Sequence, residues 1–196
     1  MSGERTAHRR HKLETVLSRR QPDLTVVLEN VHDPHNVSAV LRTCDAVGVL
    51  EVHLVYTTEP FPEISHRTSA GAYKWVRLRR YRELHSCYAA LRAAGFQIWA
   101  TALIPEARLL YTLDLTQPIA VVFGNEHRGV SPEACQLADG ICSIPQVGMV
   151  QSLNISVACA VILYEAFRQR WNAGFYEHRR LPQHQYEQLL HEWLQL

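Results

Sequence analysis

The sequence predicts an α/β domain with a mainly parallel β-sheet, and two observations indicate this fold class. Short apolar runs, too short to form helices, alternate with longer stretches whose apolar residues recur at helical spacing. Polar, glycine-bearing loops also follow two of the late runs, residues 121–123 and 141–144. In open parallel sheets ligands lie beyond the carboxyl ends of the strands, so these two loops together indicate a pocket. Each loop alone would favour an ordinary surface turn.

The predicted elements follow one another with few interruptions. A basic amphipathic helix is expected over Thr6–Arg20, with Leu13, Val16 and Leu17 on its apolar face and Pro22 after its end. Strands are expected over Leu24–Leu28, Leu50–Tyr56, Lys74–Tyr81, Gln97–Leu103, Val121–Phe123 and Ile141–Ile144. Helices are expected from about Val37, over Arg82–Ala94, briefly between the two late strands, from about Ser152, and from about Gln183. The last of these would bury Tyr186, Leu189, Leu190, Trp193 and Leu194, and residues 57–72 would form an irregular loop.

Length and composition limit the class of protein. At 196 residues, with 47% hydrophobic residues, the chain suits one domain with a sizeable core. We expect no signal peptide, and the longest apolar region, residues 155–164, is too short to span a membrane. Five cysteines without a C-x-x-C pair indicate a reducing cytoplasm. The pairs His8/His11 and His32/His35 have metal-like spacing, but no further ligands complete them, so no metal is predicted. Neither a G-x-G-x-x-G fingerprint nor a P-loop is present.

The net charge of +1 conceals a strong segregation of charge. Residues 1–20 carry six Lys/Arg against two acids, and residues 67–82 carry six Lys/Arg and no acid. The second run also contains Tyr73, Trp75 and Tyr81. Cations interleaved with aromatic rings suit phosphate neutralisation and base stacking, although a single basic run is often only a solvated face. Two such runs favour a nucleic-acid partner.

Two positions stand out for their polar side chains. Ser152 is a plausible N-cap of the long helix, whereas Asn154, expected one turn inside it, needs a partner for its amide. That partner could be a neighbouring backbone group or a ligand. Arg42 is the only Lys/Arg between residues 21 and 66, and with Asn36 it could flank one anion. A salt bridge from Arg42 to Asp45 is an equally good interpretation.

Three segments together resemble a known family. They are LENVHDPHNVSAVLRTCDAVG (Leu28 to Gly48), FGNEHRGVS (Phe123 to Ser131) and IPQVGMVQSLNISVACAVILYEA (Ile144 to Ala166). They are similar, in the same order, to the three motifs of the SpoU (TrmH) family of RNA ribose 2′-O-methyltransferases. Where the family often has glycine two residues after the first-motif asparagine, Ser38 stands here, which resembles the subgroup that methylates a tRNA guanosine. The basic N-terminal helix and the C-terminal extension also resemble that subgroup.

The resemblance implies a fold and a set of site residues. The fold would be a knotted SPOUT-type methyltransferase core over residues 23–170, with a trefoil knot near residues 97–165 and helical extensions at 1–22 and 171–196. S-adenosylmethionine would be bound by Thr101, Leu103, Gly124, Ile144, Met149 and Leu153. The catalytic and substrate residues would be Asn36, Arg42, Glu126, Ser152 and Asn154, and the tRNA contacts Arg9, Lys12, Arg20, Arg168 and Arg170. The family acts as a homodimer, so Arg42 of one subunit is expected to face the partner's cofactor.

The implied reaction is methylation of the ribose 2′-OH of the D-loop guanosine at tRNA position 18. Alignment of the reacting atoms can supply about 7–11 kcal/mol of such a barrier. A guanidinium with a pKa above about 12 is a poor base, so we expect Arg42 to anchor a substrate phosphate and stabilise the developing alkoxide. Glu126 is expected to orient backbone donors or the ribose, and Asn36 and Asn154 to fix loop geometry. Methylation of ribosomal RNA or of another tRNA position, and RNA binding without catalysis, remain alternatives.

Overall fold

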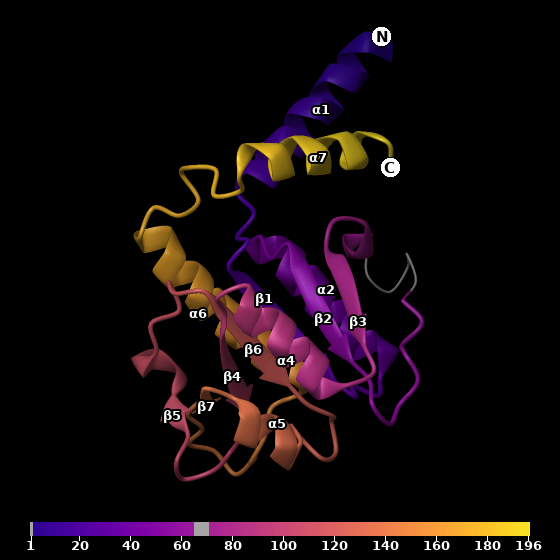
Figure 1. Cartoon of the computed structure of the whole chain (residues 1–196). Coiled ribbons are helices and arrows are strands. Elements are labelled where there is room, and N and C mark those ends of the chain that lie inside the picture. Colours follow the sequence, from indigo (N-terminus) through magenta and orange to yellow (C-terminus); the bar gives the residue numbers. More distant parts are fainter. Residues whose placement is uncertain (1, 65–70) are drawn as a thin grey trace.

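A single parallel β-sheet of seven strands forms the centre of the described chain. The computed structural model describes residues 2–64 and 71–196, with only the backbone described for residues 2–6. Its strands are β1 (Leu24–Glu29), β2 (Glu51–Val55), β3 (Arg77–Tyr81), β4 (Gln97–Thr101), β5 (Arg108–Leu109), β6 (Ile119–Phe123) and β7 (Gly140–Ser143), in the spatial order β3-β2-β1-β6-β4-β7-β5 (Figure 1). Every described strand pair is parallel, as the sequence predicts.

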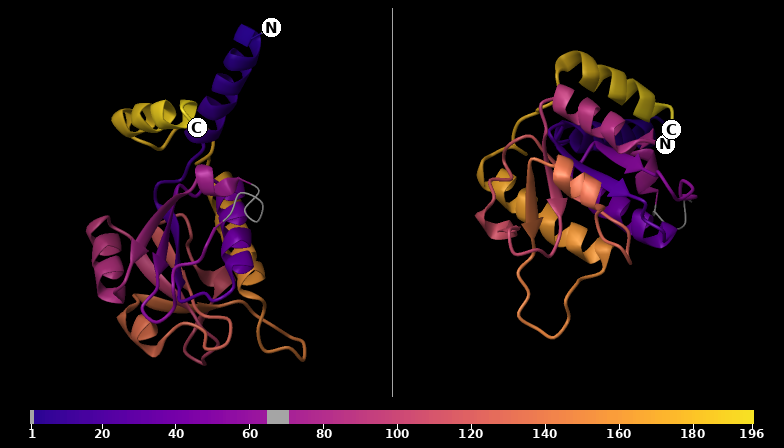
Figure 2. Two further views of the ribbon diagram at one scale, coloured as in Figure 1. Left: turned by 90° about the vertical axis from the view of Figure 1, so that its right-hand side faces the viewer. Right: turned by 60° about the horizontal axis from the view of Figure 1, so that its bottom comes forward.

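Helices cover both faces of this sheet, which explains why its central strands are apolar throughout. On one face α2 (Pro34–Val47) packs against α6 (Ile155–Asn172), and on the other lie α4 (Leu84–Ala93) and α5 (Pro132–Leu137), as Figure 2 shows in its left-hand view. Two 3₁₀ turns, η1 (Ala72–Lys74) and η2 (Leu110–Thr112), complete the layers. The strands β1 and β6 are buried along their whole length, because a parallel sheet covered on both faces leaves no solvated side.

The two terminal helices pack on each other beside the amino ends of the strands. The helix α1 (Ser2–Ser18) buries Leu13 and Leu17 against Leu189 and Trp193 of α7 (Gln183–Leu194), and both helices project from the sheet at the top of Figure 1. The predicted apolar side of α7 is confirmed, with Tyr186 and Leu194 partly buried at its margin. The prediction for Val16 is wrong, because its side chain is 37% exposed on the outer side of α1.

Local capping explains the main differences from the predicted boundaries. The helix α2 starts three residues before Val37, because the Asp33 carboxylate accepts a hydrogen bond from the His35 N–H and Pro34 occupies the first turn. The strand β3 begins at Arg77 rather than Lys74, because the preceding residues form η1. The two-residue strand β5 was not predicted, since so short a segment has no periodicity. Residues 65–70 of the predicted loop lie outside the described residues.

Three further predictions concern the whole chain. No helix in the described part of the chain is both long enough and apolar enough to cross a membrane. Among the side chains that the structure describes, no group of three or more His, Cys, Asp or Glu is arranged to hold a metal ion. The trefoil knot near residues 97–165, and the division of the chain at residues 22 and 170, stay predictions.

Candidate active site

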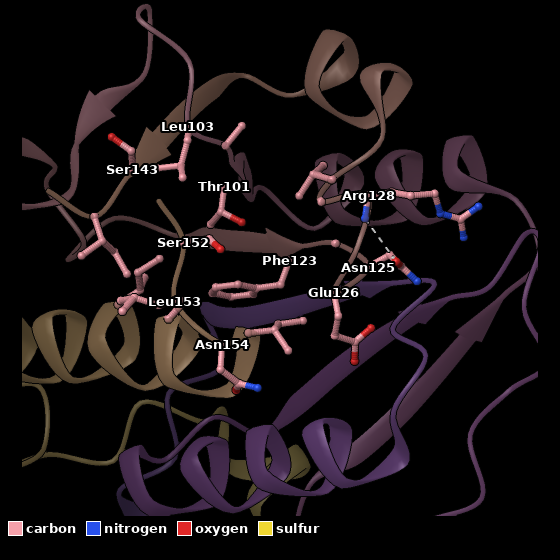
Figure 3. A pocket seen from close by; sticks show the side chains of 18 of the residues that line it. Thr101, Leu103, Phe123, Asn125, Glu126, Arg128, Ser143, Ser152, Leu153 and Asn154 are labelled. Atoms are coloured by element: carbon pink, nitrogen blue, oxygen red, sulfur yellow. Dashed lines mark hydrogen bonds between the residues drawn. The ribbon is translucent and has the colours of Figure 1, made fainter. Parts of the chain in front are cut away.

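A pocket of about 580 Å³ lies at the carboxyl ends of β4, β6 and β7, where the sequence predicts one (Figure 3). The two glycine-bearing loops that follow β6 and β7 form its walls. Its lining includes the predicted cofactor residues Thr101, Leu103, Gly124, Ile144 and Leu153, and the predicted catalytic residues Glu126, Ser152 and Asn154. A volume of this size is typical of sites for ligands as large as a nucleoside.

The loop after β6 is a tight turn that only glycine can close. A methyl group at Gly124 would come within 2.1 Å of the Gly129 and Val130 backbone. Asn125 and Gly129 exchange backbone hydrogen bonds of 3.0 and 2.8 Å, and Gly129 has a φ of +70°. The Asn125 side chain then accepts from the His127 N–H at 2.9 Å, as in an Asx turn. This turn holds the backbone of the pocket wall in place.

Glu126 connects this turn to the loop between β1 and α2. Its carboxylate accepts hydrogen bonds from the backbone N–H groups of His32 (2.9 Å) and Asp33 (3.1 Å), and from the Asn36 amide (2.8 Å). Burial works to raise the pKa of Glu126, but the Asn36 amide and the backbone donors outweigh it, so the pKa lies below its usual value. Glu126 is therefore a carboxylate near neutral pH, with its oxygens already occupied by donors.

Asn154 continues the same network on the other side of Asn36, and corrects the predicted start of α6. Asn154, not Ser152, is the N-cap, because its side-chain oxygen accepts from the Ser156 N–H at 2.9 Å. Its amide nitrogen donates to the Asn36 side-chain oxygen at 3.1 Å. Asn154, Asn36 and Glu126 thus form a continuous hydrogen-bonded series that joins α6, α2 and the loop after β6. Figure 3 shows Glu126 and Asn154 on the side of the pocket next to α2.

The end of β1 supports the loop after β6 and the segment after β2, and this role was not predicted. Asn30 has a φ of 49°, and its side-chain oxygen accepts from the N–H groups of Thr57 and Thr58. Its backbone oxygen accepts from the Asn125 side chain at 2.8 Å. The preceding carboxylate, Glu29, accepts from the N–H and hydroxyl of Ser131 at 2.8 and 2.6 Å. An asparagine directly after a buried strand was the available signal, since asparagine tolerates the left-handed conformation.

The pocket interior combines apolar side chains with a buried polar atom. Apolar side chains line it, among them Leu103, Phe123 and Leu153. The side-chain oxygen of Gln146 is buried in this lining and has no hydrogen-bond partner among the described residues. Such an oxygen is costly to bury unless a ligand or water donates to it. Gln146 was not predicted, and its position next to Pro145 in the second loop was the only signal.

Three predicted catalytic or cofactor residues do not line this pocket: Asn36, which bonds Glu126 and Asn154, Met149 and Arg42. Met149 does not line it and is 99% exposed, because residues 145–151 form a loop that projects from the body of the molecule (Figure 2). Arg42 is exposed on α2, and it makes no ion pair with any residue whose side chain is described. The alternative salt bridge to Asp45 is not formed, because Asp45 pairs with Arg20 instead.

Among the five predicted tRNA contacts, two are buried, which argues against a contact with tRNA. Arg20 has an exposed fraction of 0%, bonds Asp45 and packs over the Trp193 ring. Arg170, also 0% exposed, is paired with Asp23 at 2.6 Å. A buried guanidinium offers no surface to a tRNA, and sequence spacing could not distinguish these two from their neighbours. Arg9, Lys12 and Arg168 are exposed, with Arg168 bound to Glu165 at 2.7 Å.

Comparison with known proteins gives a consistent result. Residues 23–164 match the model of the SpoU rRNA methylase family. The chain is 56% identical over 191 residues to a tRNA (guanosine(18)-2′-O)-methyltransferase of Thermus thermophilus, an alignment that covers 97% of this chain and 98% of the relative. It is also similar to the TrmH/SpoU tRNA modifying enzyme of A. aeolicus, with a TM-score of 0.91, 39% identity, and coverage of 97% and 96% of the two chains. The AdoMet complex of the SpoU methyltransferase AviRb from Streptomyces viridochromogenes has a TM-score of 0.69, 29% identity, and coverage of 78% and 62%.

Proposed function

This chain belongs to the SpoU methylase family, and we propose that it methylates the ribose 2′-OH of the D-loop guanosine at position 18 of tRNA, with S-adenosylmethionine as donor. The observation that carries the proposal is the hydrogen-bonded series Asn154–Asn36–Glu126 at the rim of the pocket. Its three members are among the five catalytic and substrate residues that the family resemblance implies. The named tRNA activity of the Thermus relative, which aligns with nearly the whole chain, supports tRNA as the substrate.

The pocket residues fit the cofactor. Thr101, Leu103, Gly124, Ile144 and Leu153 would hold it, and the unpartnered oxygen of Gln146 would accept one of its hydrogen bonds. When bound, the cofactor supplies a methyl group attached to a positively charged sulfur. Because transfer disperses that charge, the apolar side chains Leu103, Phe123 and Leu153 favour the reaction by keeping water out. Glu126 does not serve as the proton acceptor, since its oxygens are occupied by the β1–α2 loop.

Arg42 would act on the substrate from a second subunit. It is exposed on α2, it does not line the pocket of its own chain, and it has no ion pair among the described residues. We propose that Arg42 binds a substrate phosphate and stabilises the alkoxide that forms on the ribose, while the proton leaves through a phosphate oxygen or water. A guanidinium stays protonated near neutrality, and its planar fork matches a phosphate.

A homodimer is part of this proposal. The helix α6 exposes Val157, Tyr164 and Trp171 at seven-residue intervals, with exposed fractions of 47%, 52% and 55%. Residues seven apart lie on one side of a helix, so this apolar stripe is available to a second copy. The stripe lies in the same helical layer as α2, which carries Arg42.

Exposed basic residues of α1 and of α6 would bind tRNA outside the pocket. Arg9 and Lys12 on α1 and Arg168 on α6 are exposed and carry the charge needed to neutralise phosphates. We retain the division into an N-terminal extension (1–22), a methyltransferase core (23–170) and a C-terminal extension (171–196). We also propose a cytoplasmic location, because tRNA is the substrate and all five cysteines are free.

The experiment is methylation of tRNA transcripts with tritium-labelled S-adenosylmethionine, followed by mapping of the label. We expect incorporation at the 2′-O of the D-loop guanosine, and none when this guanosine is replaced by adenosine. Label on ribosomal RNA or on another tRNA position would overturn the choice of substrate. Tight cofactor binding by calorimetry without any methylation of RNA would instead indicate a binding module that has lost catalysis.

A further inference from the structure

The second basic run of the sequence, residues 67–82, is not used by the proposed catalytic machinery. Its described part contains η1 and β3, and β3 is an edge strand of the sheet. Side chains of a strand alternate between its two faces, so Arg77 and Arg79 lie on one side and Arg80 on the other. Arg77 is neutralised by Glu192 at 2.6 Å and Arg79 by Glu51 at 2.9 Å. The basic face that remains is therefore the one that carries Arg80.

Arg80 and Arg82 gather over one aromatic ring on that face. Their guanidinium carbons lie 5.9 and 4.2 Å from the centre of the Phe61 ring. Arg82 also donates to the backbone oxygens of Tyr56 and Glu59, both at 3.2 Å, and so holds the segment that contains Phe61. Neither arginine has an acidic partner among the described residues, and Arg80 is exposed. We call Phe61, Arg80 and Arg82 the Phe61 platform.

This platform is continuous with the rim of the proposed active site. The segment before Phe61 is fixed by Asn30, whose side chain accepts from the N–H groups of Thr57 and Thr58. Glu59 in the same segment forms an ion pair with Arg128 at 3.2 Å, on the turn that also carries Glu126. That pair neutralises Glu59, which lies two residues before Phe61. In Figure 1 this segment begins at the carboxyl end of β2 and runs beside β3, and the loops of the pocket follow the carboxyl ends of strands in the same sheet.

We propose that the Phe61 platform binds a phosphate of the RNA strand that flanks the target ribose, with Arg80 as the contacting residue. This inference rests on the proposed function, because it assumes that RNA enters the pocket. An exposed guanidinium without a carboxylate partner keeps its full charge for a phosphate. Phe61 and Arg82 act as positioning residues, since stacking and the two backbone bonds limit the directions that Arg80 can take. An RNA strand that reaches the pocket rim would pass this cation.

The strand β3 itself provides a matched test. Arg80→Gln removes the unpaired cation, whereas Arg79→Gln removes a paired cation from the opposite face of the same strand. Binding of the tRNA transcript would be measured by filter binding over a range of salt concentrations, together with kcat, KM for tRNA, and cofactor affinity. We expect Arg80→Gln to weaken tRNA binding roughly three- to tenfold and to lower the salt slope by about one. Its kcat and cofactor affinity should stay at the wild-type level, and Arg80→Lys should keep the wild-type salt slope.

The outcomes separate this inference from the proposed function. If the wild-type protein methylates the D-loop guanosine but Arg80→Gln binds tRNA with an unchanged salt slope, the platform is not a phosphate site. Equal losses in Arg79→Gln and Arg80→Gln would also overturn it, because they would reflect net charge alone. If the wild-type protein neither binds nor methylates tRNA, the proposed function itself fails.

Discussion

Glu126 is a half-buried carboxylate whose hydrogen bonds link separate segments of the site. Its hydrogen bonds come from residues 90 to 94 positions away in the chain, on the loop before α2 and on its first turn. These donors favour the charged form, which is why the pKa of Glu126 is lowered in spite of its burial. The carboxylate therefore fixes the loop after β6 to the loop before α2, whereas the proposed function assigns the chemistry to Arg42 and the cofactor.

Glu126→Gln tests this role. In glutamine one carboxylate oxygen is replaced by an amide nitrogen, which cannot accept a hydrogen bond from the donors that face Glu126. We therefore expect a loss of about 1–3 kcal/mol in the free energy of unfolding. Turnover should fall as well, because the series Asn154–Asn36–Glu126 is broken. Chemical denaturation and kcat measurements check both effects, with Glu133→Gln on the surface of α5 as the control. A variant with wild-type stability and turnover would contradict the role.

The pH dependence of stability gives a second readout for the same side chain. Because the folded pKa of Glu126 is lowered from 4.5, its contribution is fully present above the unfolded pKa. The contribution is lost as pH falls through the folded pKa. We therefore expect the stability difference between the wild-type protein and Glu126→Gln to shrink on acidification below about pH 4.5. A difference that stays constant with pH would show that the charge of Glu126 is not responsible.

At the scale of elements, the two pocket loops differ in the hydrogen bonds and close backbone contacts that fix their conformation. The loop after β6 is closed by the reciprocal bonds of Asn125 and Gly129 and by the absence of a side chain at Gly124. The loop after β7 has exposed apolar side chains at Val147, Met149 and Val150. Its later part becomes fixed again at Asn154, the cap of α6.

Two glycine variants distinguish the loops. Gly124→Ala places a methyl group 2.1 Å from backbone atoms that cannot give way, so we expect cofactor binding to be lost or weakened at least about tenfold. Gly148→Ala meets nothing within 4 Å, and it should leave cofactor affinity unchanged. Isothermal titration calorimetry with S-adenosylmethionine provides the measurement. Wild-type affinity in Gly124→Ala would show that the turn after β6 does not shape the cofactor site.

At the scale of the whole molecule, the proposed site is divided between two chains. A mixture of two inactive variants tests this arrangement directly. In a heterodimer, the Arg42→Ala chain keeps an intact Gly124 and the Gly124→Ala chain keeps an intact Arg42. These two residues form one complete site only if Arg42 acts across the interface. We therefore expect random mixing to restore roughly a quarter of wild-type activity, since half of the dimers are mixed and each mixed dimer has one intact site. Mixtures as inactive as the separate variants would show that Arg42 acts within its own chain.

Buried arginines link distant parts of the chain, and Arg170 is the clearest case. Its guanidinium bonds the carboxylate of Asp23 at 2.6 Å and the backbone oxygens of Leu115 and Gln117 at 2.9 Å. Asp23 is shared with Arg180 of the C-terminal extension at 2.8 Å. Arg170 thus joins α6, the start of β1 and the segment before β6.

Replacement of Arg170 should therefore affect stability and not RNA binding. We expect Arg170→Met to lower the free energy of unfolding by on the order of 3 kcal/mol, because buried carbonyl groups lose their donors. Its tRNA affinity, measured below the unfolding transition, should remain close to the wild-type value. The neighbouring Arg168→Gln should show the reverse, with a small change in stability and weaker tRNA binding, because Arg168 is exposed. A large loss of tRNA affinity in folded Arg170→Met would restore it as a substrate contact.

The pattern of short apolar runs was sufficient for the α/β class, for nearly every strand and for the two pocket loops, because hydrophobic periodicity and glycine are local properties of a chain. The motifs around Asn36, Glu126 and Asn154 were also visible in the sequence. Their hydrogen bonds to one another were not, because they join residues up to 118 positions apart. The same limit applies to the basic residues. Arg168 and Arg170 look alike in a list of charges, and only the packing of α6 against the start of β1 buries one of them and leaves the other in solvent.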